Sequence, residues 1–114
     1  MNPHVVTFEE LNTDYFEPSK RRRESKGVVK KRTKGFGEVT SGLTDGSALE
    51  EAERCFSCGT CNGCENCYVF CPDASIMKTE EVFSRQVDYD FCKGCGICFS
   101  ECPRGAISLK EEAR

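Results

Sequence analysis

The sequence has no tryptophan, a single histidine and no apolar run of membrane-spanning length. An apolar fraction of 38% over 114 residues leaves little material for a hydrophobic core, and a chain of this length forms one small domain at most. The lone histidine, His4, has no acid–nucleophile arrangement near it. Gly35-Phe36-Gly37 lacks the third glycine and the preceding strand of a phosphate-binding loop. We therefore expect no catalytic site on this chain, and something other than a core must stabilise it.

Signals for export are missing too, because the sequence contains no apolar signal segment. We expect a cytoplasmic protein, in a compartment that keeps thiols reduced. Cysteine is abundant in spite of this, with ten residues that all lie within the last sixty. Such a cysteine content can indicate disulfides, a zinc ribbon or an iron–sulfur site. The spacing of the cysteines discriminates between these three interpretations.

Eight of the ten cysteines form two copies of one pattern. The copies are Cys61-x2-Cys64-x2-Cys67-x3-Cys71-Pro72 and Cys92-x2-Cys95-x2-Cys98-x3-Cys102-Pro103. A disulfide framework usually joins segments far apart, and a zinc ribbon has no use for a third closely spaced cysteine or for the Cys-Pro ending. The pattern is instead that of an iron–sulfur site, in which a tight loop supplies three thiolates and the fourth comes from elsewhere.

The two motifs and their prolines resemble those of bacterial ferredoxins that carry two [4Fe–4S] clusters, over roughly residues 55–110. The resemblance implies that the fourth cysteine of each run ligates the other cluster. One cluster would be held by Cys61, Cys64, Cys67 and Cys102. The second would be held by Cys92, Cys95, Cys98 and Cys71. Since such ligands are gathered only in the folded chain, we expect residues 55–110 to be largely unfolded without iron.

The motifs are also an internal repeat, in which residues 61–76 recur as residues 92–107. We expect an α+β, pseudo-twofold two-cluster ferredoxin fold with an extended N-terminal arm and a short helix before the first motif. In this family a helical turn and then a strand follow each Cys-Pro, which implies strands near 74–77 and 105–109. Apolar and polar residues alternate within 83–90, which predicts another strand, paired with its symmetry mate.

A helical segment stands before the first motif, where Ser47 can cap the helix and Glu50 can complete a capping box. Residues 48–59, together with 36–39 and 42–43, resemble the cysteine-rich segment of the glutamate synthase small-subunit family of flavin-containing NAD(P)H oxidoreductases. The chain as a whole is similar to ferredoxin modules attached to such flavoproteins and to small ferredoxin subunits of 2-oxoacid oxidoreductase complexes. The resemblance implies a flavoprotein or 2-oxoacid oxidoreductase subunits as partners.

Charge divides the chain into residues 1–46, an expected arm that docks on a partner subunit, and residues 47–114, the expected two-[4Fe–4S] domain. Nine basic residues and one acid between Lys20 and Lys34 give the arm a run of +8, whereas residues 47–114 hold seven basic and twelve acidic residues, a net −5. A solvated tail and nucleic-acid binding are alternatives for such a run, although we expect no nucleic-acid partner. Six apolar side chains favour an arm wrapped over a partner: Val5, Val6, Phe8, Leu11, Tyr15 and Phe16.

The function we expect is that of an electron-transfer subunit, which relays single electrons through two clusters within a larger oxidoreductase complex. By resemblance, the host is a 2-oxoacid:acceptor oxidoreductase that works with a flavin-containing NAD(P)H subunit. A free ferredoxin is the alternative, because the acidic half suits docking on basic patches of many enzymes. A zinc-dependent nucleic-acid adaptor is a third interpretation, and it would be colourless.

Three residues near the first motif need separate hypotheses. Cys55 and Cys58 are spaced as if they began a third motif. Three hypotheses compete for them: they are thiols that bind no cluster, they are ligands to a third centre completed by a partner, or they belong to a shifted ligand frame. Glu65 places a carboxylate near the first cluster. Because a negative charge disfavours the reduced state, we hypothesise that the cluster held by Cys61, Cys64 and Cys67 has the lower potential.

Overall fold

A computed structural model describes residues 4–111, and the chain divides into two compact units. The motif unit contains residues 4–17 and 56–111, and therefore both cysteine motifs. The second unit contains residues 18–55. This division differs from a boundary at residue 46, because residues 4–17 pack with the motifs. The functional division into a docking arm and a cluster domain stays a prediction.

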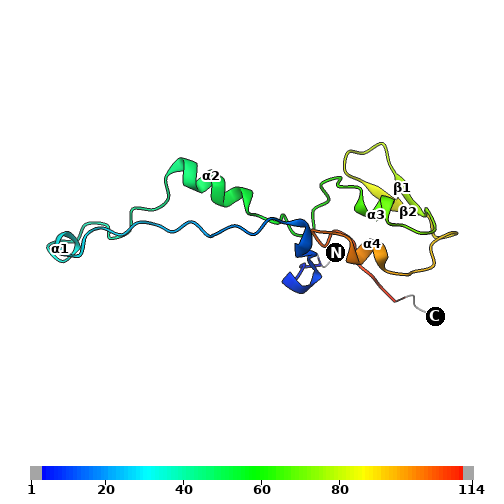
Figure 1. Ribbon diagram of the computed structural model, residues 1–114, viewed down its shortest axis with the longest axis horizontal. Helices are drawn as coiled ribbons and strands as arrows, with labels where there is room; N and C mark the ends of the chain where they lie inside the picture. The colour runs from blue at the N-terminus through cyan, green and yellow to red at the C-terminus, as the bar shows by residue number, and fades with distance from the viewer. Residues whose placement is uncertain (1–3, 112–114) are drawn as a thin grey trace. The chain divides into compact units, whose positions relative to one another are not determined.

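The motif unit is built from short elements (Figure 1). They are η1 (Phe8–Glu10), η2 (Thr13–Tyr15), α3 (Asn66–Val69), β1 (Ile76–Lys78), β2 (Arg85–Val87) and α4 (Ile97–Ser100). The strands β1 and β2 form a two-stranded antiparallel sheet, in which Ile76 pairs with Val87 and Lys78 pairs with Arg85. The helix α3 packs against both α4 and β1.

The strand expected within residues 83–90 is present as β2, but it pairs with β1 and not with a symmetry mate. The strand expected at 105–109 is absent from the described residues, where that segment has no regular structure. The repeat explains both differences. Residues 54–56, which correspond to β2 in the first copy, directly follow a helix and offer no strand to pair with. The turns expected after each Cys-Pro are confirmed, since Ala74 N donates to Cys71 O at 3.3 Å and Gly105 N donates to Cys102 O at 3.4 Å.

The hydrophobic core is minimal, as the composition predicts. Among residues 4–111, Ile76 is the only large apolar side chain that is buried, with 3% of its surface exposed. Many other large apolar side chains are exposed, including Val82, Tyr89 and Phe91. A sheet of two three-residue strands is too small to be stable alone. The motif unit must therefore draw its stability from other interactions.

The helix expected before the first motif is present as α2 (Asp45–Glu53), but the predicted cap is wrong. Thr44 is the N-cap, and its Oγ1 accepts a hydrogen bond from Ser47 N at 3.3 Å. Thr44 supplies the capping hydroxyl three residues earlier, so Ser47 lies inside the first turn of the helix. The capping box that we expected between Ser47 and Glu50 is replaced by this earlier cap.

The second unit contains α2, α1 (Val29–Arg32) and two antiparallel segments. Gly27 N donates to Val39 O at 2.9 Å, and Ser41 N donates to Ser25 O at 3.0 Å. These bonds bring the two ends of residues 25–41 together, with α1 in the connection between them. No helix within residues 4–111 has the length and apolar character needed to span a membrane.

Candidate iron–sulfur cluster sites

The two cysteine loops follow the same backbone path. The helices α3 and α4 occupy equivalent positions of the repeat, and each begins after a left-handed residue, Glu65 with φ 67° or Gly96 with φ 77°. Two further equivalent pairs have positive φ: Gly63 (74°) with Gly94 (69°), and Ala74 (50°) with Gly105 (60°). A left-handed conformation costs a residue with a side chain roughly 1–2 kcal/mol. The repeat seen in the spacing of the cysteines therefore extends to the backbone, even where the first copy has no glycine.

The fourth cysteine of each motif accepts a hydrogen bond from a backbone amide. Ser75 N donates to Cys71 Sγ at 3.3 Å, and Ala106 N donates to Cys102 Sγ at 3.2 Å. The Ser75 hydroxyl also lies 3.2 Å from Cys71 Sγ. The hydroxyl and the amide of Ser75 together lower the pKa of the Cys71 thiol. Such donors stabilise a thiolate, which is the form of cysteine that ligates a metal.

The third cysteines of the two motifs, Cys67 in α3 and Cys98 in α4, also behave alike. Burial is the main cause that raises the pKa of both thiols, and neighbouring cysteines raise it further. A buried thiol gives up its proton when a metal cation offsets the charge of the thiolate. The backbone thus places equivalent thiols in equivalent environments.

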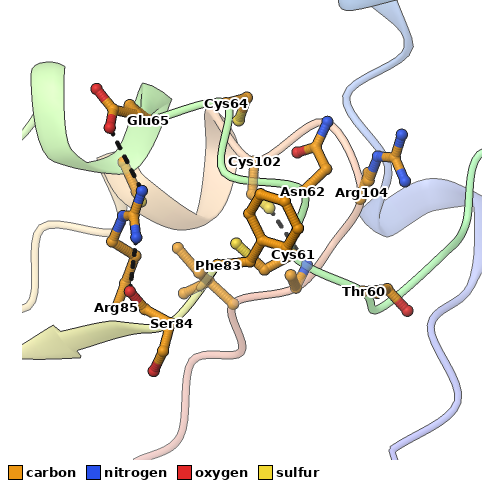
Figure 2. Close-up of a pocket in the computed structure, with 13 residues that line it drawn as sticks. Thr60, Cys61, Asn62, Cys64, Glu65, Phe83, Ser84, Arg85, Cys102 and Arg104 are labelled. Carbon is orange, nitrogen blue, oxygen red and sulfur yellow. Dashed lines mark hydrogen bonds and ion pairs between the residues drawn. The ribbon is translucent and has the colours of Figure 1, made fainter. Parts of the chain in front are cut away.

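A first cavity, of about 250 Å³, brings cysteines of the two motifs together. Four cysteines line it: Cys61, Cys64, Cys67 and Cys102. Figure 2 shows the ring of Phe83 close to Cys61 and Cys102 at this cavity. A Cβ atom on Gly63 would lie 2.6 Å from Phe83 Cδ1, so only glycine at this position allows the close approach of the ring.

A second cavity, of about 990 Å³, contains the complementary set. Its cysteines are Cys71, Cys92, Cys95 and Cys98. Each cavity thus takes three cysteines from one motif and the fourth from the other, and four thiols suit the thiophilic iron of a [4Fe–4S] cluster. Ligation stays a prediction, because no three His, Cys, Asp or Glu side chains among residues 4–111 are grouped as they would be around a metal ion.

Charged side chains at the first cavity form a connected group. Glu65 Oε1 lies 2.6 Å from Lys78 Nζ and 3.5 Å from Arg85 Nη2. The hydrogen bond from Lys78, together with the positive charges of Lys78 and Arg85, lowers the pKa of Glu65. Arg85 Nη1 also donates to Ser84 O at 2.6 Å, and Arg104 lines the cavity from the turn after Cys102. The carboxylate of Glu65 is therefore paired with cations and does not act alone.

The second cavity has one such pair, in which Lys93 Nζ lies 3.1 Å from Asp73 Oδ1. The hydrogen bond and the negative charge of Asp73 raise the pKa of Lys93. Both residues line the cavity, but 58% of the Lys93 side chain is exposed to solvent. Water therefore screens this pair more than it screens Arg85 at the first cavity, whose side chain is 15% exposed.

Residues 4–17 form a strap along the motif unit, which sequence reasoning missed. The ring centroids of Phe16 and Phe56 are 4.6 Å apart, and Asn12 Nδ2 donates to Ser100 O at 2.8 Å. Tyr15 donates from its hydroxyl to Glu101. We expected the apolar side chains of this segment to contact another subunit, whereas several of them pack on their own chain. The strap contacts the end of α4 directly before Cys102.

Cys55 and Cys58 lie outside both cavities and are exposed. Cys58 belongs to the motif unit, and Cys55 is the last residue of the second unit. The three hypotheses for these thiols therefore stay open. The eight cysteines of the two motifs are the ones that the fold brings together.

Comparison with known proteins identifies one segment. Residues 85–108 match the sequence model of the family described as a 4Fe–4S binding domain. The match begins at β2 and spans the whole second motif. No curated protein and no solved structure matches the chain. A 4Fe–4S binding domain is therefore present, which indicates a [4Fe–4S] cluster and a function in iron–sulfur electron transfer.

Proposed function

We propose that this chain carries single electrons through two [4Fe–4S] clusters, as a subunit of a larger oxidoreductase. The observation that supports the proposal is the crossed grouping of the cysteines. Each cavity is lined by three cysteines of one motif and by the fourth cysteine of the other. The family match covers only the second motif, and the equivalent backbone of the first motif supports a second cluster.

In this proposal a bound cluster supplies a centre that takes up and releases one electron at a time with little change of shape. The residues of the chain hold it and set its environment. Backbone amides donate to the sulfur of Cys71 and of Cys102, which disperses the negative charge of these ligands. Phe83 lines the first cavity, and its ring lies directly against Gly63.

The partner subunit would dock on the connection within residues 25–41, which we call the arm tip. Its apolar side chains Val28, Val29 and Phe36 are exposed, beside the basic residues of α1. A free-standing basic tail has no need of such apolar groups. The partner surface that fits is acidic with an apolar pocket. By resemblance, the partners are subunits of a 2-oxoacid:acceptor oxidoreductase and its flavin-containing NAD(P)H subunit.

A free ferredoxin is the second candidate, and the net charge of −5 over residues 47–114 favours it. Such a carrier would reach several enzymes through their basic patches. The arm tip distinguishes the two candidates, because a diffusing carrier would not depend on it. Electron transfer by iron–sulfur clusters is common to both.

Iron content tests the clusters themselves. Anaerobically purified protein should be brown and hold about eight irons per chain. Replacement of both Cys55 and Cys58 by Ala should leave this number unchanged, whereas a loss of about four irons would assign one of them to a cluster. A colourless protein loaded with zinc would contradict the proposal.

Anaerobic isolation of the tagged chain from its native host tests the partner. We expect thiamine-enzyme subunits or a flavoprotein to remain bound in stoichiometric amount. Substitution of Lys30, Lys31 and Arg32 by Glu should release them, as should Phe36→Ala. Leu49→Ala, which changes an exposed apolar residue of α2 in the same unit, is the matched control. Recovery of the chain alone would favour the free ferredoxin.

A further inference from the structure

We propose that Arg85 and Arg104 set the potential of the cluster in the first cavity and make it the more easily reduced of the two. This inference rests on the proposed pair of clusters. It reverses the hypothesis drawn from Glu65, which considered one carboxylate without its neighbours. The argument uses the burial of the two guanidinium groups, their place in the cavity and the charges at equivalent positions of the second cavity.

The Nε atoms of Arg85 and Arg104 are buried without a hydrogen-bond partner among residues 4–111, and they are the only side-chain nitrogen or oxygen atoms there with this property. A buried donor without an acceptor costs about 1–3 kcal/mol. Two such donors would be an unusual loss for a unit with so small a core. Both arginines line the cavity that contains four cysteines. The sulfur atoms of a bound cluster and of its ligands are acceptors that would satisfy such donors.

The two arginines reach the first cavity from different elements. Arg85 is the first residue of β2, and its guanidinium is fixed by Ser84 O at 2.6 Å and by Glu65 at 3.5 Å. Arg104 lies in the turn after the second motif, and its carbonyl accepts a hydrogen bond from Gly59 N at 2.7 Å. Figure 2 shows the two side chains on opposite sides of Cys102. Positive charge therefore flanks this cavity.

The repeat provides an internal reference for these charges. The position of Arg104 in the second motif corresponds to Asp73 in the first. Asp73 lines the second cavity, so equivalent positions carry opposite charges at the two cavities. Two cations and one carboxylate line the first cavity, whereas two cations and two carboxylates line the second. The first cavity is the more positive of the two.

Reduction adds one negative charge to a cluster, and both positive charge and N–H donors stabilise the reduced state. Arg85 acts in a weakly screened environment because its side chain is 15% exposed. Glu65 opposes it, but this carboxylate is paired with Lys78 and is 41% exposed. The balance at the first cavity favours reduction. Arg85 and Arg104 are thus positioning and potential-setting residues, without a catalytic step of their own.

A redox titration followed by EPR tests the inference. Wild-type protein should show two midpoint potentials. Arg104→Gln and Arg85→Gln should each lower the higher midpoint and leave the lower one unchanged. Arg104→Lys keeps the charge but loses the Nε–H donor, so its higher midpoint should fall between those of wild type and Arg104→Gln. Lys93→Gln, at the second cavity, is the matched control and should lower only the lower midpoint.

Two results would overturn the inference: a higher midpoint that does not move in either glutamine variant, or a lower midpoint that falls instead. Iron is measured on each sample, so that a failure of the two-cluster proposal can be distinguished from a failure of the inference about the arginines. Wild-type protein with about four irons would refute the pair of clusters. If a glutamine variant loses iron, Arg104→Lys and Arg85→Lys test the hydrogen-bond role alone, because they keep the charge but lose the Nε–H donor, and their higher midpoint should fall below that of wild type. With about eight irons, midpoints equal to wild type in both lysine variants would refute the hydrogen-bond role.

Discussion

The two copies of the repeat, residues 61–76 and 92–107, share a backbone conformation and their cysteines but not their charged side chains. Their helices, turns and N–H···S hydrogen bonds occupy equivalent positions. Their charges differ, because Asp73 corresponds to Arg104 and Asn62 corresponds to Lys93. The comparison teaches that the spacing of cysteines determines where thiols lie, whereas the residues between them determine the electrostatic environment. In our proposal, this difference gives the two centres unequal potentials.

In our proposal both copies bind iron, so the largest effect should come from its removal. We expect a chelator under anaerobic, reducing conditions to unfold most of residues 56–111, since Ile76 alone cannot hold the unit together. Circular dichroism and amide hydrogen exchange should show loss of structure in both copies at once. Protection that persisted in one copy would show that the copies are not interdependent.

The next largest effect is a difference in stability between alanine substitutions at two equivalent glycines, one in each copy. Gly63 and Gly94 both have positive φ, so alanine should cost roughly 1–2 kcal/mol at either position. Only at Gly63 does the new Cβ meet Phe83, at 2.6 Å, which should add about 1–3 kcal/mol. Gly63→Ala should therefore lose its visible cluster absorbance at a lower guanidinium concentration than Gly94→Ala. Equal midpoints would contradict the tight contact at Phe83.

A smaller effect should follow from the strap, which contacts Ser100 and Glu101 directly before Cys102. Phe16→Ala removes an aromatic contact with Phe56 and should cost about 1–2 kcal/mol. The cluster that depends on Cys102 should then be lost before the other. Val82→Ala, at an exposed apolar residue of the motif unit that lines neither cavity, serves as control. Simultaneous loss of both clusters would show that the strap supports the whole unit.

The smallest effect concerns Glu65, which adopts the conformation that Gly96 provides in the second copy. Glu65→Gly relieves roughly 1–2 kcal/mol of backbone strain. It also loses the ion pairs with Lys78 and Arg85, and it adds about 0.5–1 kcal/mol of backbone entropy to the cost of folding. The gain and the losses oppose each other, so the net change in stability should be small. Gly96→Ala, which adds strain without relief, should destabilise the protein more in the same guanidinium titration.

The sequence contained enough information to predict the grouping of the cysteines and the turns after each Cys-Pro. These features depend on local spacing and on the internal repeat. It did not predict the strap or the pairing of β2 with β1, because both depend on contacts between segments distant in sequence. The cap at Ser47 was misplaced because Thr44 offers the same hydroxyl one turn earlier. The ion pairs of Glu65 were not predicted either, because Lys78 and Arg85 come close to it only in the folded chain.

The crossed assignment of ligands is the central claim, and iron content of paired cysteine variants tests it most directly. Cys61→Ser should lose about four of eight irons. Addition of Cys102→Ser should cost no further iron, because both residues belong to one cluster, whereas addition of Cys71→Ser should remove the remaining four or so. The reverse result, with further loss on adding Cys102→Ser and none on adding Cys71→Ser, would show that each motif supplies all four ligands of its own cluster.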